Sequence, residues 1–243
     1  MRGLADTPIQ TVEGASTEDL AQSVLAPTKV DSEELARSLG DTLREAVDRH
    51  GERIVLLCSF QKEESVLIDE LLRIGEERGG GTPVKIVTID TGVLFAETLQ
   101  TWKAFEQRFG VSIEVFDASN ASAPWSGPEH CCSVAKVAAL ERALEGAEGW
   151  ITGIRREQGP TRAQTELTEE DSKRGLYKYN PLALWSEKEL WTRIFERELP
   201  YNPLHDQGYA SIGCAPCTLP GTGREGRWAG SDKTECGLHV DAP

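Results

Sequence analysis

The segment Ile54-Val55-Leu56-Leu57-Cys58 is a continuous apolar run, and the polar stretch 59–65 follows it directly. An apolar run without polar alternation is expected for a strand that is buried on both faces of a sheet. The pattern then becomes helical over residues 64–74. This strand, loop and helix form the first unit of an α/β fold.

Strand-like and helical patterns continue to alternate on both sides of this unit. A helix is predicted from Asp31, where Glu34 completes a capping box ahead of an apolar face. Further strands are predicted at 84–89, 113–116, 150–153 and 177–179, and further helices at 97–109, 134–145 and 186–198. The alternation predicts a doubly wound, mostly parallel sheet.

The two ends of the chain depart from this pattern. Residues 1–30 are rich in Ser, Thr, Ala and acidic residues without periodicity, which predicts a mobile leader. Residues 31–199 carry the predicted α/β nucleotide-binding domain. In residues 200–243 Gly, Pro and Cys dominate, so we expect a cysteine-containing C-terminal extension that something other than an apolar core holds in place.

Composition narrows the possible partners and the cellular location. The net charge of −14 disfavours nucleic acid or an anionic membrane surface as the main partner. No apolar run approaches the ~20 residues that span a bilayer, and the N-terminus lacks the apolar core of a signal peptide. We therefore expect a cytoplasmic protein, in which six cysteines are more often metal ligands or reactive thiols than disulfides.

Polar loops follow three of the predicted strands, at residues 59–65, 90–92 and 153–158. In an open parallel sheet, ligands bind outside the carboxyl ends of the strands. Backbone N–H groups at the start of a helix can also hold an anion. Each loop alone is compatible with an ordinary connection, but three loops on one edge predict a nucleotide pocket.

Four cysteines form two close pairs, Cys131-Cys132 and Cys214-Ala215-Pro216-Cys217. The second pair has a spacing common to zinc, iron–sulfur and redox sites. Successive side chains point in different directions, so adjacent thiolates reach one small ion with difficulty, whereas a [4Fe–4S] cluster offers separate irons. The pattern favours a cluster over zinc, and two unrelated core pairs remain an alternative. Cys58 is expected to be a small core residue.

Cys236 lies close to the C-terminus, after Arg224 and Arg227 and before His239. Cationic neighbours stabilise a thiolate, which is the nucleophilic form of cysteine. The alternative is an incidental tail cysteine, because chain ends contribute little to a core. Four glycines between residues 221 and 230 predict either ordinary turns or a flexible lead that lets the tail close over a substrate and reopen.

Together these motifs resemble the assimilatory adenylyl-sulfate (APS) and phosphoadenylyl-sulfate (PAPS) reductases, over residues 54–239. The segments that carry the resemblance are Ser59-Phe60-Gln61, Ile89-Asp90-Thr91-Gly92, Cys131-Cys132 with Lys136, and residues 151–156, 180–182, 199–204, 211–218, 224–228 and 235–239. The two cysteine pairs and the Glu235-Cys236-Gly237-Leu238-His239 motif resemble the iron–sulfur branch that acts on APS.

The resemblance implies a fold of the adenine nucleotide alpha hydrolase-like, PP-loop type. It also implies reduction of APS to sulfite and AMP, in assimilatory sulfate reduction for cysteine biosynthesis. Cys236 would attack the sulfur and become an S-sulfocysteine, and thioredoxin or a glutaredoxin-like reductant would release sulfite. Cys131, Cys132, Cys214 and Cys217 would hold a [4Fe–4S] cluster that organises the site and its charge.

The resemblance further implies which residues bind the substrate. They are Ser59, Phe60, Gln61, Ile89, Asp90, Gly92, Lys136, Gly153, Arg162, Arg224, Arg227 and His239. Displacement from a phosphosulfate builds charge on the leaving phosphate, which fixed cations stabilise. Arg155 and Arg156 are alternatively expected to pair with Glu157 or Glu166.

Three other functions remain open. PAPS as the substrate would need the same chemistry. An ATP pyrophosphatase of the PP-loop class would carry Ser-Gly-Gly-x-Asp-Ser, and segment 59–65 lacks both glycines and the aspartate. A zinc- or cluster-bound binding module would explain four cysteines but not Cys236 and His239. The chain also departs from the family pattern at Ala96, where proline is expected, and in a short 228–236 segment.

Overall fold

The computed structural model describes residues 32–118, 134–228, 232, 234–236 and 238–239. The predicted leader and the Cys131-Cys132 pair therefore lie outside the described residues.

The helices and strands follow one another in the alternating order that the sequence predicts. They are α2 (Ser32–His50), β1 (Ile54–Leu57), α3 (Lys62–Glu77), β2 (Lys85–Asp90), α4 (Ala96–Phe109), β3 (Glu114–Asp117), α5 (Val134–Ala143), β4 (Gly149–Ile151), β5 (Thr168–Asp171), β6 (Leu176–Tyr179) and α6 (Glu187–Glu196). Short 3-10 turns, η1 (Gly51–Arg53), η2 (Arg156–Gln158), η3 (Pro160–Arg162), η4 (Pro203–Gln207) and η5 (Ala215–Cys217), connect them.

The six strands form one sheet in the order β3-β2-β1-β4-β6-β5. All neighbouring pairs are parallel except β5 and β6, which are antiparallel. The predicted α/β class and mostly parallel sheet are thus confirmed. The chain runs outward from β1 to β3 and then returns to the other side of β1 with β4. Strand order therefore reverses between β1 and β4, which is where open sheets of this type bind ligands.

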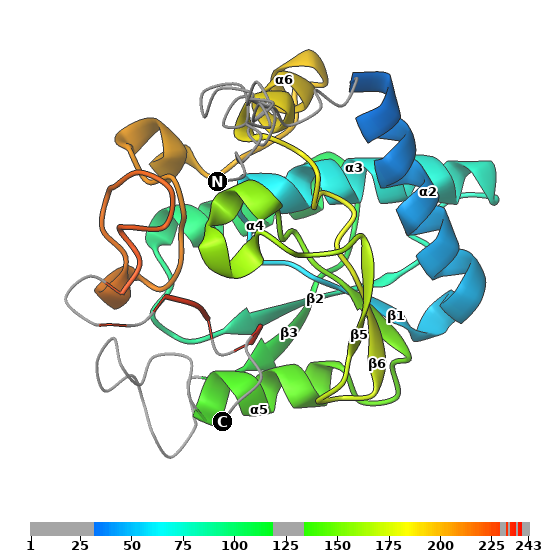
Figure 1. Ribbon diagram of the computed structural model, residues 1–243, viewed down its shortest axis with the longest axis horizontal. Helices are drawn as coiled ribbons and strands as arrows, with labels where there is room; N and C mark the ends of the chain where they lie inside the picture. Colours follow the sequence, from blue (N-terminus) through cyan, green and yellow to red (C-terminus); the bar gives the residue numbers. More distant parts are fainter. Residues whose placement is uncertain (1–31, 119–133, 229–231, 233, 237, 240–243) are drawn as a thin grey trace, which may run out of the picture. The chain divides into compact units, whose positions relative to one another are not determined.

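Both faces of the sheet are covered, but unequally (Figure 1). Helices α2, α3, α4 and α6 lie on one side, and α5 lies on the other. Val55 and Leu57 of β1 belong to a buried apolar cluster with Ala139 and Leu140 of α5. Because strand side chains alternate between faces, Leu56, which is fully buried, faces the opposite layer. This two-sided burial explains the continuous apolar run of β1.

Several bounds differ from the sequence prediction by a few residues, and the differences at β5 and α6 have clear causes. Strand β5 was not predicted, because its sequence Thr-Glu-Glu-Asp is polar throughout. It is an edge strand that pairs only with β6, so it does not need apolar side chains on both faces. Helix α6 ends at Glu196 rather than at residue 198. Glu198 has a φ of 50°, a left-handed conformation that does not continue a helix.

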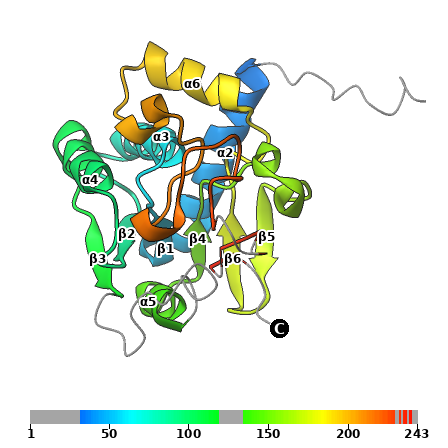
Figure 2. The same ribbon diagram turned by 90° about the vertical axis from the view of Figure 1, so that its left-hand side faces the viewer.

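The C-terminal segment is part of the apolar core, contrary to the prediction that something else holds it. Cys214, Cys217, Trp228, Cys236 and Leu238 are all buried in the cluster that also contains β1 and α5 residues. They fill the part of the sheet face that α5 leaves uncovered. These side chains are spaced without helical or strand periodicity, so no sequence pattern marks them as core. Figure 2 shows this segment in front of the strand ends.

Polar contacts also fasten the C-terminal segment to the loops at the carboxyl edge of the sheet. The side-chain oxygen of Gln61 accepts a hydrogen bond from the Ile212 backbone N–H at 2.8 Å. The Lys62 ammonium donates to the Ala210 carbonyl at 3.0 Å. The Ala215 N–H donates to the Val93 carbonyl at 2.8 Å. The segment is therefore held by both packing and hydrogen bonds.

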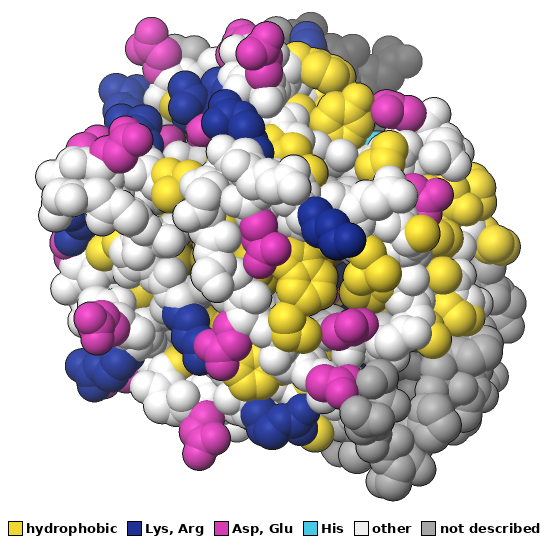
Figure 3. Space-filling model, turned by 180° about the vertical axis from the view of Figure 1, so that it is seen from behind, with side chains coloured by type: hydrophobic (Ala, Val, Ile, Leu, Met, Phe, Trp, Pro, Cys, Tyr) yellow, Lys and Arg dark blue, Asp and Glu magenta, His cyan; other side chains and the backbone are white. Residues whose placement is uncertain are grey.

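The outer surface carries both signs of charge. On the face in Figure 3, Lys and Arg side chains are interspersed with Asp and Glu side chains around scattered hydrophobic groups. Within the described part of the chain, no helix has the length and apolarity needed to cross a membrane.

If the C-terminal segment shares the core, truncating its buried Leu238 will destabilise the whole domain. Leu238→Ala should cost about 2 kcal/mol or more, which lowers the melting temperature by about 4 °C or more for a chain of this size. Leu219→Ala is the matched control, because Leu219 is 56% exposed and should change stability by only about 0.5 kcal/mol. Equal melting temperatures for both variants would contradict the packing described above.

Candidate active site

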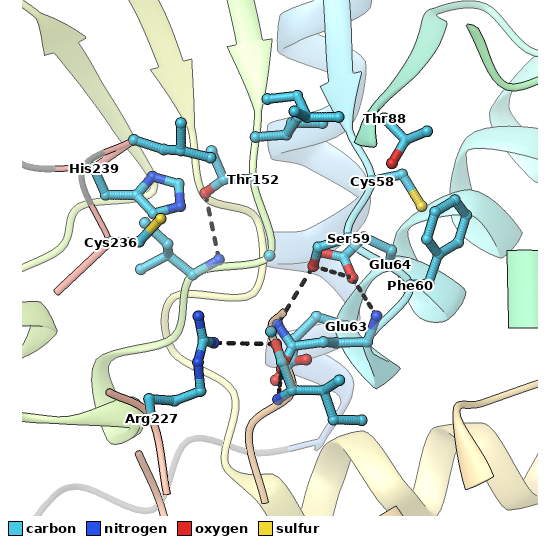
Figure 4. Close-up of a pocket in the computed structure, with 18 of the residues that line it drawn as sticks. Cys58, Ser59, Phe60, Glu63, Glu64, Thr88, Thr152, Arg227, Cys236 and His239 are labelled. Atoms are coloured by element: carbon cyan, nitrogen blue, oxygen red, sulfur yellow. Dashed lines mark hydrogen bonds between the residues drawn. The ribbon is translucent and has the colours of Figure 1, made fainter. Parts of the chain in front are cut away.

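A pocket opens at the carboxyl ends of β1 and β4, where the strand order reverses. Loops after β1, β2 and β4 line one side of it, and the C-terminal segment lines the other. Figure 4 shows Cys236 and His239 on one side, facing Ser59 and Glu64 of the β1–α3 connection on the other. The three polar loops singled out in the sequence thus meet at one edge.

The β1–α3 connection supplies Ser59, Phe60 and Gln61, which all line the pocket. Phe60 has a φ of 61° and is almost fully buried, stacked on Trp102 at 5.4 Å. A non-glycine residue in this left-handed conformation needs the surrounding packing to hold it. The strained turn keeps Ser59 and Gln61 at the pocket surface while Phe60 anchors the loop beneath α4.

The loop after β2 contributes in a different way from the one expected. Ile89 lines the pocket, whereas Asp90 and Gly92 are not among the described residues that line it. The carboxylate of Asp90 instead accepts a hydrogen bond from the Gly92 N–H at 2.8 Å, which closes a tight turn. Asp90 and Gly92 therefore shape this loop in the structure.

The loop after β4 comes very close to the first turn of α3. A Cβ atom at Gly153 would lie 2.7 Å from the Glu63 Cβ and 3.0 Å from a Glu64 carboxylate oxygen. Only glycine allows this approach. Gly153, predicted as a substrate-binding residue, accordingly lies in the pocket wall, shortly after the end of β4.

Two buried glutamates at the start of α3 have opposite protonation. Glu63 is paired with Arg155, whose Nε donates to it at 3.0 Å, and this charge lowers the pKa of Glu63 against the effect of burial. Glu64 accepts from the Ser59 hydroxyl at 3.2 Å and the Gln61 N–H at 3.0 Å. Burial, together with the charge of Glu63, raises the pKa of Glu64 to about 8. Glu64 is therefore mostly protonated at neutral pH.

Arg155 and Arg156 are used structurally, as the alternative interpretation expected. Arg155 pairs with Glu63 and with Glu157, and its side chain is 3% exposed. Arg156 pairs with Glu166 at 3.3 Å. Neither residue lines the pocket among the described residues.

Cys236 is buried at 7% exposure and lines the pocket beside three arginines. Arg162 lies in η3 and Arg224 in the C-terminal segment, and both side chains pair with Glu235 at 2.7 Å. Arg224 lines the same pocket as Cys236, and its partner Glu235 is the residue that precedes Cys236. The thiol thus lies among fixed cations, which favour its nucleophilic form.

Arg227 and Lys136 also line the pocket. Arg227 donates to the Ile212 carbonyl at 3.1 Å and lies over the Trp228 ring at 4.6 Å. A Cβ atom at Gly213 would lie 2.5 Å from the Arg227 guanidinium, so the glycine makes room for it. Lys136 comes from the first turns of α5. The predicted cations therefore converge from α5, η3 and the C-terminal segment.

His239 stacks on Trp150, with ring centroids 5.6 Å apart and an interplanar angle of 6°. Burial, reinforced by the positive charges of Arg162 and Lys178, holds the pKa of His239 well below its usual range. The imidazole is therefore neutral at physiological pH. His239 lines the pocket as expected, but as a neutral imidazole rather than as a cation.

Cys217 lies in η5 and Cys214 directly precedes it, and both are buried in the apolar cluster that contains α5 residues. The Cys214 sulfur lies 3.2 Å from the Thr91 hydroxyl. Cys131 and Cys132 fall outside the described residues and precede the start of α5 by only two or three positions. Within the described part, no three Cys, His, Asp or Glu side chains form a metal site. Two soft sulfur donors, buried beside the helix that follows the other pair, fit an iron–sulfur cluster.

The structure adds polar residues in and beside the pocket that sequence reasoning missed. Glu63, Glu64 and Gln158 line the pocket, and Glu235 pairs with Arg162 of its lining. The three glutamates are buried, although charged residues are rarely buried unless paired. The side chains of this set connect the β1–α3 turn to η3 and to the C-terminal segment. The only signal in the sequence was their position inside motifs that were assigned to the substrate.

Comparison with known proteins identifies the family. The sequence profile of the phosphoadenosine phosphosulfate reductase domain matches residues 53–220. The chain is 38% identical over 259 residues to a Gloeobacter violaceus protein named phosphoadenosine 5'-phosphosulfate reductase, covering 99% of this chain and all of the relative. It is 40% identical over 215 residues to a Geobacillus kaustophilus protein named adenosine 5'-phosphosulfate reductase, covering 82% of this chain and 89% of the relative.

Solved structures share the fold at lower sequence identity. A phosphoadenylyl-sulfate reductase from Candida auris superposes with a TM-score of 0.64 at 21% identity, covering 85% of this chain and 98% of that one. A Candida glabrata FMN adenylyltransferase gives a TM-score of 0.63 at 16% identity, covering 82% and 69%. These likenesses concern the fold, which does not by itself assign an activity.

The raised pKa of Glu64 predicts how stability depends on pH. The folded chain keeps this proton up to pH about 8, whereas the unfolded chain loses it near the ordinary value of 4.5. The free energy of unfolding should therefore fall as pH rises through this window, by about 1 kcal/mol per pH unit.

Glu64→Gln mimics the protonated carboxyl and should flatten this dependence. Urea unfolding midpoints at several pH values between 5 and 8 provide the measurement. Glu76→Gln, on the exposed end of the same helix, is the matched control and should retain the wild-type slope. An unchanged slope in Glu64→Gln would show that Glu64 is ionised in the folded chain.

Proposed function

Because this chain belongs to the phosphoadenosine phosphosulfate reductase family, we propose that it reduces adenosine 5′-phosphosulfate to sulfite and AMP. As a member of this family it is an oxidoreductase that acts on a sulfur group. The observation that carries the proposal is the position of Cys236. Its thiol lies in the switch-point pocket, beside Arg162 and Arg224 and across from the loop that follows β1.

The reaction proceeds in two displacements. The Cys236 thiolate attacks the sulfur of the phosphosulfate, a sulfur–sulfur bond forms, and the sulfur–oxygen bond to AMP breaks. A thioredoxin thiolate then attacks the Cys236 sulfur and sulfite leaves with the bonding electrons. The second thioredoxin thiol resolves the mixed disulfide and restores Cys236. Both reducing electrons come from the dithiol, so each step balances without another electron donor.

The pocket supplies what the first displacement requires. Charge develops on the phosphate oxygen that leaves with AMP, and fixed cations stabilise it. Lys136, Arg162, Arg224 and Arg227 are the candidates. Neutral His239 would donate a hydrogen bond to a substrate oxygen. Ser59, Gln61, Ile89 and Gly153 would contact the nucleotide, whose phosphate lies at the strand ends in this fold class.

Cys131, Cys132, Cys214 and Cys217 would hold a [4Fe–4S] cluster. When bound, it would hold α5 and η5 together and so fix Lys136 and its charge beside the pocket. On this assignment residues 31–199 form the nucleotide-binding domain, and residues 200–243 form the cluster-binding segment and the catalytic tail. We place the reaction in the cytoplasm, within assimilatory sulfate reduction for cysteine biosynthesis.

PAPS is the second candidate substrate. The Gloeobacter relative, which aligns over nearly the whole chain, is named as a reductase of PAPS. Two others, from Geobacillus kaustophilus and Bacillus subtilis, are named as reductases of APS. The chemistry at Cys236 is identical for both substrates. The two differ by a 3′-phosphate, so side-by-side assays separate them.

The direct test is sulfite release by the anaerobically purified protein with thioredoxin, offering APS and PAPS at equal concentrations. We expect turnover with a strong preference for APS. Cys236→Ser should reduce the rate to about one thousandth or less, because the nucleophile is lost, while AMP binding persists. Thr234→Ala, exposed in the same tail, is the control. Absence of sulfite from both substrates would reject the proposed function.

A second prediction concerns the cysteine pairs. Cys214→Ser should lose the bound iron and nearly all turnover together, because a serine hydroxyl is a poor ligand for a cluster held by thiolates. Iron content per chain and the sulfite assay on one preparation provide the two measurements. An iron-free variant that turns over at the wild-type rate would separate the cluster from activity.

A further inference from the structure

Glu235 precedes the proposed nucleophile, and four neighbouring groups donate hydrogen bonds to its carboxylate. Arg162 binds its carboxylate through two nitrogens, Nε and Nη2, each at 2.7 Å. Arg224 donates at 2.7 Å and Thr161 at 3.3 Å. The backbone N–H of Cys236 donates to the same carboxylate at 2.7 Å.

The electrostatics of this cluster favour a permanent carboxylate. Burial alone would raise the pKa of Glu235. The hydrogen bonds and the charge of Arg162, together with the charge of Arg224, instead lower this pKa to about 2. Burial and the neighbouring Arg162 lower the pKa of Arg224 to about 10, and Glu235 opposes this effect. The carboxylate is thus the counterion that allows two guanidinium groups to lie together beside the pocket.

Arg162 is itself anchored to the body of the domain. Its Nη1 donates to the side-chain oxygen of Gln158, and Gln158 donates to Glu63 at 3.1 Å. Glu63 lies in the first turn of α3. A continuous chain of hydrogen bonds therefore runs from α3 through η2 and η3 to Glu235 and the Cys236 backbone.

We propose that Glu235 is a positioning residue, which holds Cys236 in the pocket through its pairing with Arg162 and Arg224. We call these ion pairs of Glu235 the latch. The catalytic consequence rests on the proposed function. Cys236 is only 7% exposed, so a protein reductant reaches its sulfur only when these ion pairs open. The same two guanidinium groups are proposed to bind the substrate anion, so Glu235 and the phosphosulfate compete for them.

The competition predicts an effect that general destabilisation would not produce. Glu235→Gln removes the charge but keeps the shape, which loosens the latch and frees Arg162 and Arg224 for an anion. The kcat for sulfite release should fall about 10- to 100-fold, because the thiol is no longer held in line. The KM for APS should stay the same or fall. A variant that is merely misfolded would show a raised KM.

The latch can be tested without any substrate. Iodoacetamide alkylation of Cys236 is followed by mass spectrometry of the tryptic peptide 234–243, in which it is the only cysteine. Glu235→Gln should raise the alkylation rate about tenfold or more over wild type, because the tail opens more often. Glu235→Asp keeps the charge and should give an intermediate rate. Glu225→Gln, an exposed neighbour that contacts Thr222, is the matched control.

The outcomes separate this inference from the proposed function. An alkylation rate in Glu235→Gln equal to that of wild type would overturn the latch, whatever the enzyme assay shows. So would a kcat that is unchanged, or a KM that rises in proportion to the loss of activity. Failure of the wild-type protein to release sulfite would reject the proposed function, while the alkylation measurement would still decide the role of Glu235.

Discussion

Buried ion pairs between carboxylates and arginines hold the two halves of this pocket together. Glu63 pairs with Arg155 beneath the β1–α3 turn, and Glu235 pairs with Arg162 at the opposite wall. Gln158 hydrogen-bonds to both pairs. Removing one member of a buried pair leaves an uncompensated charge, at a typical cost of about 3–5 kcal/mol. The geometry of the pocket therefore depends on all of these groups being present at once.

The sheet explains why such a pocket forms at this place. Strand order reverses between β1 and β4, where a pocket opens, and α5 is the one helix of the described residues that covers the neighbouring face of the sheet. The C-terminal segment fills the remaining area with buried side chains, among them Trp228 and Leu238. Packing of this segment thus brings a thiol from the C-terminal segment to the carboxyl edge of the sheet. A reactive cysteine on an unanchored tail would lack this orientation.

The sequence predicted the parts of the structure that follow from regular patterns. The apolar run of β1 and the alternation that follows it gave the α/β class, and three polar loops located the pocket edge. Sequence patterns could not reveal burial that has no period. Edge strand β5 is polar, the core residues of the C-terminal segment are irregularly spaced, and the role of Glu235 depends on arginines distant in sequence. The neutral state of His239 likewise depends on burial and on Arg162 and Lys178.

Trapping the covalent intermediate tests most directly whether Cys236 attacks the substrate sulfur within this pocket. The anaerobically purified protein would be incubated with APS without a thiol reductant, and its peptides mapped by mass spectrometry. We expect one sulfonate group on peptide 234–243, one AMP released per chain, and loss of the group as sulfite when thioredoxin is added. AMP release without this adduct, or a sulfonate on another cysteine, would contradict attack by Cys236.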